Sequence, residues 1–281
     1  MKTRNLPLLL CLFSLYLLVS CDKNKEEADP ETETTFTLSE NQAISESLAD
    51  DANTVFFEAA ASEGLSGFRT TQVVESTNTL SCATVTVTPQ NTFPKTIVID
   101  FGAGCTSADG VTRKGKINIV LSDTVRHHGT TAVMTFDGYH VQGFKVEGTI
   151  TWTNTSTQNG LSWTREIDNG KVTAPGGNYY WLHEGTKYVT QSAGANTPLN
   201  LLDDVFTVTG NHTVTNPSGD SRSATITEAL EKKTICGHVS KGKIKIEGPH
   251  HFAILDYGDG TCDRVATISI DGNAPRTFLL P

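Results

Sequence analysis

The sequence predicts an all-β protein: a single antiparallel β-meander domain with one N-terminal amphipathic helix packed on it. About a dozen short segments after residue 82 alternate apolar and polar residues, and Asn-Gly or Asp-Gly pairs separate several of them, which is the pattern of a meander. No Pro/Gly-rich linker divides these segments, so residues 65–281 are expected to form one domain. The pattern leaves open a curved sheet, a sandwich or a half-barrel.

Residues 1–20 are typical of a signal peptide. Two basic residues precede an apolar run at 8–19. This run is shorter than the roughly 20 residues that a transmembrane helix needs. The run is followed by Cys21, and Leu-Val-Ser-Cys at 18–21 resembles the lipobox of bacterial lipoproteins. The resemblance implies cleavage before Cys21 and lipidation of this residue, hence an outer-membrane lipoprotein that contacts the membrane through its lipid anchor. An ordinary signal peptide cut near Ser20 is the alternative.

The formal net charge of −9 is concentrated near the N-terminus. Residues 22–63 hold 12 acidic and 2 basic side chains, whereas residues 64–281 hold 19 and 18. A nearly neutral body lacks the basic surface that nucleic acids require, so no nucleic-acid partner is expected. The segment 21–37 is acidic and has no apolar periodicity, and we expect it to be a disordered tether after the lipidated cysteine.

Lys-Glu-Glu at 25–27 resembles a signal that sends some lipoproteins of Gram-negative bacteria to the cell surface. A solvated charge run explains the same three residues equally well. The sequence therefore leaves open whether the protein lies on the cell surface or on the periplasmic face of the outer membrane.

Residues 38–64 form the predicted helix. Ser39 and Gln42 match a capping box, and Leu38 stands where a hydrophobic staple would place it. Apolar residues then follow helical spacing as far as Gly64, which is a suitable C-terminal stop. We expect this apolar stripe to pack on the sheet.

Four cysteines remain in the body of the chain: Cys82, Cys105, Cys236 and Cys262. They lack the spacing of a zinc site, so disulfides are favoured in an exported protein. In each of the two segments a Cys opens a strand, a Pro-containing turn follows, and a second strand returns through Asp-aromatic-Gly to another Cys. Since the two ends of an antiparallel hairpin are adjacent, we predict the bridges Cys82–Cys105 and Cys236–Cys262, one near each end of a long sheet.

The alternation over 144–153 is that of a half-buried strand. Asn159-Gly160 predicts a two-residue type I′ turn after it. That turn would pair Ser156 with Trp163 and Trp152 with Ile167, which places both tryptophans on the core face.

Two further Asx-Gly pairs predict turns, Asn169-Gly170 and Asp137-Gly138, the latter between strands at 133–136 and 139–141. After this second strand the alternation of apolar and polar residues shifts by one position, so a bulge is expected at Gln142-Gly143. The other predicted strands are 113–121, 179–184, 186–191, 204–214, 222–235, 239–247, 251–257, 264–270 and 276–280.

The run Leu-Asp-Tyr-Gly-Asp-Gly-Thr-Cys-Asp at 255–263 resembles a motif in a family of uncharacterised Gram-negative lipoproteins. Shorter segments at 93–96, 99–102 and 113–117 extend the resemblance over most of residues 82–281, although Ala103 stands where an acidic residue is expected. The resemblance implies an envelope location and a single domain. It implies no activity and no catalytic residue.

No arrangement of nucleophile, acid and base is recognisable, so we expect a protein that is not an enzyme and needs no cofactor. Asp256, Asp259 and Asp263 offer oxygen atoms that a calcium ion could use, but their spacing is not that of an EF-hand. Aspartates beside a strand end are more often turn formers, so no metal site is predicted.

Aromatic residues concentrate between 139 and 188. Two of the three tryptophans are assigned to the core. Trp181, together with Tyr179 or Tyr180, therefore remains available to stack on a ligand such as a sugar ring.

The sequence as a whole favours an outer-membrane-anchored binding or structural module with an unidentified ligand. A periplasmic carrier of lipids or lipoproteins, with a curved sheet that holds a helix, is one alternative, and a surface carbohydrate-binding protein is another. A glycan and a lipid therefore both remain possible ligands, and the sequence gives no oligomeric state.

Overall fold

The structure is a computed structural model that describes residues 29–67, 78–157, 160–197 and 200–281. The predicted signal peptide, Cys21 and the Lys-Glu-Glu segment lie outside the described residues, as does Asn159 of the first predicted Asn-Gly turn. Among the described residues one long helix, α1 (Pro30–Ser62), precedes the strands.

The strands are β1 (Thr84–Thr88), β2 (Lys95–Asp100), β3 (Cys105–Thr106), β4 (Thr112–Leu121), β5 (Thr131–Val141), β6 (Phe144–Asn154), β7 (Ser162–Thr173), β8 (Tyr180–Ala193), β9 (Val205–Thr215), β10 (Ser221–Lys233), β11 (Lys241–Glu247), β12 (Phe252–Asp259), β13 (Val265–Ile270) and β14 (Arg276–Leu279). A 3₁₀ turn, η1 (Leu201–Asp203), precedes β9.

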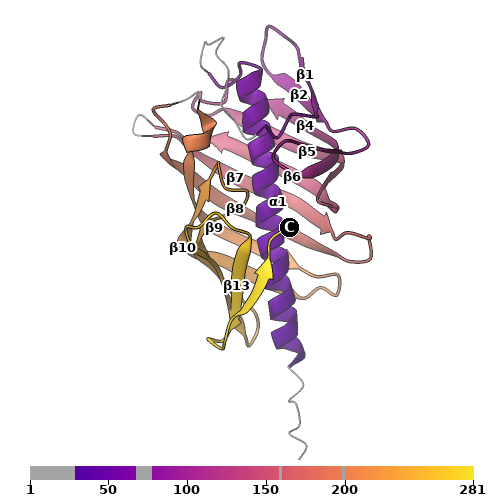
Figure 1. The fold of residues 1–281 in the computed structure, drawn as a ribbon, viewed down its shortest axis with the longest axis vertical. Helices are drawn as coiled ribbons and strands as arrows, with labels where there is room; N and C mark the ends of the chain where they lie inside the picture. Colours follow the sequence, from indigo (N-terminus) through magenta and orange to yellow (C-terminus); the bar gives the residue numbers. More distant parts are fainter. Residues whose placement is uncertain (1–28, 68–77, 158–159, 198–199) are drawn as a thin grey trace, which may run out of the picture.

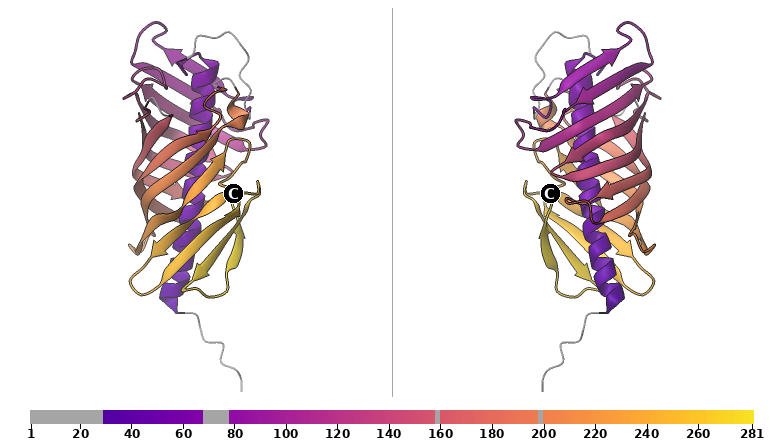
Figure 2. Two further views of the ribbon diagram at one scale, coloured as in Figure 1. Left: turned by 90° about the vertical axis from the view of Figure 1, so that its left-hand side faces the viewer. Right: turned by 90° about the vertical axis from the view of Figure 1, so that its right-hand side faces the viewer.

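All described strands belong to one antiparallel sheet of 14 strands, which confirms the predicted meander and its single helix. The spatial order follows the chain from β1 to β14, and only the two-residue β3 lies off this path, paired with β4. β1 and β14 each have one neighbour, so the sheet is open. It curves around α1, which runs along its concave side in all the views (Figures 1 and 2). Of the three alternatives, the curved sheet is the one that forms.

The helix begins eight residues before the predicted start, so the tether prediction is wrong for residues 30–37. Proline suits the first helical position, and Glu31 and Glu33 in the first turn complement the helix dipole. Tertiary contacts add to these local preferences, because Glu33 forms a 2.7 Å ion pair with Arg276 of β14. Ser39 is not a cap: inside the helix its hydroxyl donates to Thr35 O at 2.7 Å.

The helix is buried around most of its circumference because the sheet encloses it. Apolar side chains such as Leu38, Val55 and Phe56 are at most 1% exposed and join the core formed by the concave face of the sheet. Polar residues of the same helix, among them Glu46 and Asp50, are also buried. The predicted apolar stripe does pack on the sheet, but the polar face does not point to solvent.

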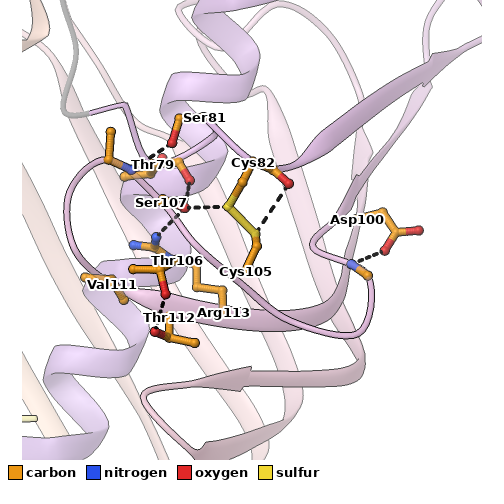
Figure 3. The surroundings of a disulfide bond; sticks show 12 residues. Thr79, Ser81, Cys82, Asp100, Cys105, Thr106, Ser107, Val111, Thr112 and Arg113 are labelled. Carbon is orange, nitrogen blue, oxygen red and sulfur yellow. Dashed lines mark hydrogen bonds between the residues drawn. A yellow bond between two sulfur atoms is a disulfide. The ribbon is translucent and has the colours of Figure 1, made fainter.

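Both predicted disulfides are present, Cys82–Cys105 and Cys236–Cys262, with Cα–Cα separations of 6.2 Å and 5.1 Å. Figure 3 shows the first bridge beside Ser107, whose hydroxyl lies 3.5 Å from Cys82 Sγ. The first bridge closes the β1–β2 end of the sheet, and the second lies near the β11–β12 end.

The tryptophan prediction is confirmed: Trp152 and Trp163 are 4% and 6% exposed. The register differs by two residues from the predicted one, because Trp152 pairs with Arg165 and Trp163 pairs with Asn154. A shift of two residues leaves every side chain on its original face, since strand side chains alternate with period two.

Two of the predicted Asx-Gly turns are instead bulges within continuous strands. Asn169, with φ +50°, lies inside β7 where the pairing with β8 shifts, and Gly138, with φ +57°, lies inside β5. Both positions adopt the left-handed conformation that a type I′ turn and a G1-type bulge share, so the local sequence fits either. At Gly148, opposite Asn169, a Cβ would lie 2.7 Å from Asn169 O, so the bulged strands approach too closely for any side chain there.

The hairpin turn between β5 and β6 is Gln142-Gly143, where a bulge was predicted. Both residues have positive φ, +49° and +87°, and Val141 pairs with Phe144 as a two-residue turn requires. The predicted strands 179–184 and 186–191 are likewise one strand, β8, which passes through Gly185 without a turn.

Candidate functional site

One face of the C-terminal half of α1 stands opposite the concave side of β6–β10. Its members recur at helical spacing: Asp50, Asn53, Thr54, Phe57 and Ala61. Cross-strand pairing builds the facing surface in two rows, Asn154–Trp163–Val189–Val208 and Trp152–Arg165–Lys187.

A cavity lies between these two surfaces. Its volume is about 100 Å³. Four aromatic rings form one continuous wall: Phe57 lies 5.3 Å from Trp152 and 5.4 Å from Trp163, and Trp163 lies 5.9 Å from Phe206, all between ring centroids. Mostly apolar cavities with a few polar groups are the usual form of small-molecule sites.

The inner end of the cavity is ionic. Arg165 Nη1 donates to Asp50 Oδ1 at 2.7 Å, and Arg165 Nη2 donates to Glu46 Oε1. Glu46 also accepts from the Lys187 ammonium group. All four side chains are at most 9% exposed, so their charges are compensated by one another rather than by water.

The titration behaviour of this network follows from burial and pairing. Burial alone would raise the pKa of Glu46, but the charges of Lys187 and Arg165 hold it well below its usual range. At Asp50 burial prevails over the attraction of Arg165, and its pKa is raised. Burial likewise lowers the pKa of Lys232, whose ammonium group donates to the carbonyl oxygens of Cys236 and Gly237 at 2.8 and 2.7 Å.

The outer end of the cavity is formed by Asp204, Gln191 and Arg126 together with η1. Gln191 Nε2 donates to Asp204 Oδ1 at 2.6 Å. Burial raises the pKa of Asp204 to about 6, although the hydrogen bond from Gln191 and the charge of Arg126 act in the opposite direction.

The residues predicted to stack on a ligand, Trp181 with Tyr179 or Tyr180, do not form one accessible surface. Trp181 is 1% exposed, and its indole N–H donates to Ser45 Oγ of the helix at 2.8 Å. Tyr179 accepts a hydrogen bond from Asn41 Nδ2, and it packs at 5.9 Å against Trp181. Tyr180 alone is on the outer face, 37% exposed, with Lys171 over its ring. The assignment of Trp181 to a ligand surface is therefore wrong, because the alternation of β8 turns it toward the helix.

The three calcium candidates behave as turn formers. Asp256 Oδ1 accepts from Gly258 N, Asp259 Oδ1 from Thr261 N and Asp263 Oδ1 from Val265 N, at 2.9, 3.2 and 2.9 Å. Each carboxylate thus caps the turn that follows it.

Among the described residues a different trio, Asp29, Glu31 and His251, brings its potential ligand atoms within 4.8 Å of one another. His251 Nδ1 lies 2.5 Å from Asp271 Oδ2, and its Nε2 lies 2.8 Å from Asp29 Oδ2. With both ring nitrogens occupied by carboxylates, His251 links the start of α1 to the β12–β13 end of the sheet.

The cavity is not among the features predicted from the sequence, although two sequence patterns indicate it. Arg165 alternates with Trp163 and Ile167 and therefore shares the face assigned to the core. Glu46 and Asp50 are four residues apart on the helix, within its apolar spacing. Opposite charges on two buried faces predict a buried ionic contact between them.

None of the helices in the described part of the chain is long and apolar enough to cross a membrane. Comparison of the chain with protein-family models, with curated proteins and with solved structures gives no match. The fold and the site therefore define a structural class only: an open antiparallel sheet curved around a helix, with an apolar cavity between the two.

Proposed function

We propose that this protein is a non-enzymatic binding protein of the cell envelope that holds a largely apolar small molecule between α1 and the sheet. The single observation that carries the proposal is the apolar cavity between α1 and the sheet, with its wall of four aromatic rings. The charges at its inner end are paired with one another, as in a structural network.

The proposed location is the outer membrane, with the lipid of Cys21 as anchor. This part of the proposal rests on Leu-Val-Ser-Cys at 18–21 and on the resemblance of the C-terminal motif at 255–263. An anchored protein stays at a membrane, where apolar molecules are concentrated. Replacing Cys21→Ala should release the protein from the membrane fraction or block its processing; unchanged fractionation and processing would contradict the anchor.

Binding is tested with diphenylhexatriene, a hydrocarbon that fluoresces when it enters an apolar site. The wild-type protein should bind it saturably, with one site per chain. Ala61 lines the cavity and is only partly exposed, so Ala61→Trp fills the space and should abolish the binding. Ala103 lies in an exposed loop outside the cavity, so Ala103→Trp serves as the matched control and should bind as the wild type does. Equal binding by both variants would place the site elsewhere.

A further inference from the structure

The cavity lining contains buried polar atoms that lack a hydrogen-bond partner among the described residues. They are the donors Trp163 Nε1 and Arg165 Nε and the acceptors Asp50 Oδ2 and Gln191 Oε1. The four residues are between 1% and 8% exposed. Buried polar groups in folded proteins are nearly always hydrogen-bonded, so these four atoms need partners, which water or the polar group of a ligand can supply.

The residues that carry two of these atoms lie near each other on the sheet. Trp163 of β7 pairs with Val189 of β8, and Gln191 follows two residues later on the same face. Such diagonal neighbours lie about 7–8 Å apart, within reach of long side chains. Gln191 uses its amide nitrogen on Asp204, because an ionised carboxylate can only accept. The amide oxygen is therefore not used by Asp204, and the two residues that carry the indole donor and the amide acceptor are diagonal neighbours on one face.

The charges of the residues that line the cavity balance one another, which disfavours a charged ligand. Three acidic residues, Asp50, Glu58 and Asp204, are balanced by three basic residues, Arg126, Arg165 and Lys232. Arg165 is already bound by two carboxylates. An additional carboxylate or ammonium group in this apolar space would leave one buried charge without compensation, which is strongly unfavourable.

We infer that the cavity selects an uncharged amphiphile, whose apolar body contacts the aromatic wall and whose neutral polar group both donates and accepts hydrogen bonds, as an alcohol or a primary amide does. This inference rests on the proposed function and names the class of ligand for that site. The polar group accepts from Trp163 Nε1 and donates to Gln191 Oε1, while the ionic network stays intact behind it.

Head-group selectivity is measured by displacement of diphenylhexatriene at a pH where decanoate and decylamine are both ionised. Decanol, decanoate and decylamine have equal chain lengths and differ in the head group. Decanol should displace the probe at a concentration at least tenfold lower than either charged compound. Displacement by decanoate or decylamine at the same concentration as decanol would overturn the inference, while leaving the apolar cavity as a binding site. Failure of the probe itself to bind would refute the proposed function.

A pair of tryptophan variants tests the hydrogen bond. Trp163→Phe removes the unpartnered N–H and keeps an aromatic ring in the wall. It should weaken decanol binding more than diphenylhexatriene binding, by an additional factor of about 2 to 12, the range for one hydrogen bond. Trp181→Phe is the control, because Trp181 does not line the cavity and should leave both affinities unchanged. Equal losses for decanol and for the hydrocarbon in Trp163→Phe would show a packing effect and contradict the proposed contact.

Discussion

Trp152 and Trp163 lie on neighbouring strands with ring centroids 6.2 Å apart, yet only one of them has a partner for its indole N–H among the described residues. Trp152 Nε1 donates to Asn53 Oδ1 of the helix at 2.6 Å. Trp163 Nε1 is equally buried and meets no acceptor. The first tryptophan thus fixes the helix to the sheet, and the second lines the cavity with its donor unpartnered among the described residues.

This difference predicts unequal stability effects. Trp152→Phe and Trp163→Phe remove similar volumes, but the first also deprives Asn53 of its donor. We expect Trp152→Phe to lower the free energy of unfolding by about 1 kcal/mol more than Trp163→Phe does. Urea titrations of the two variants measure the difference, and a larger loss for Trp163→Phe would contradict it.

The buried network should be sensitive to the loss of a single carboxylate. Glu46→Gln keeps the shape of the side chain but leaves Arg165 and Lys187 with one charge partner fewer in a buried site. The expected cost is about 3–5 kcal/mol in the free energy of unfolding. Glu63 stands exposed at the end of the same helix, so Glu63→Gln should change stability by less than about 0.5 kcal/mol. Similar stability of the two variants would show that the network is not a structural element.

The contacts of His251 predict that the attachment of α1 to the β12–β13 end of the sheet depends on pH. Hydrogen bonds to Asp271 and Asp29 raise its pKa above the ordinary value of 6.5. A histidine with a raised pKa contributes stability that is fully present below the unfolded-state value and is lost as the pH rises through the folded-state value. NMR titration of the ring should therefore show a midpoint above 6.5, and Asp271→Asn should lower it. A midpoint at or below the ordinary value would rule out the link between α1 and the β12–β13 end.

The two disulfides predict separate, local effects. Each closes a loop with a sequence separation of 23 or 26 residues, for which chain entropy gives about 3 kcal/mol. Replacing both cysteines of one pair by serine should lower stability by about this amount and leave the other bridge intact. Non-reducing peptide mapping of the wild type checks the pairing, and a bridge between Cys82 and Cys236 would contradict it.

Much of the fold followed from local signals in the sequence. Asp100 and Asp256 each approach a disulfide through Asp-aromatic-Gly, and each accepts from the backbone N–H two residues later, at 2.8 and 2.9 Å. The hairpins and disulfides could be predicted because both depend on residues close in the sequence.

The bulges, the helix start and the cavity depended on contacts between distant residues. Asn169-Gly170 fits a turn or a bulge, and the length of the neighbouring strands decides between the two. Pro30 begins the helix, and Arg276, near the other end of the chain, holds the first turn of that helix in place. The surface position predicted for Trp181 is wrong for the same reason. The buried face of β8 is the one that packs on α1, and the local sequence of β8 does not show which face that is.

The most direct test of a ligand site between α1 and the sheet uses the three tryptophans of the chain as reporters. A ¹⁵N-labelled protein should give three indole N–H signals, which single Trp→Phe variants assign. During a titration with decanol the Trp163 signal should move most and the Trp152 signal less, while the Trp181 signal, bonded to Ser45 outside the cavity, should stay in place. A Trp163 signal that does not move, or a Trp181 signal that moves as far, would contradict binding in this cavity.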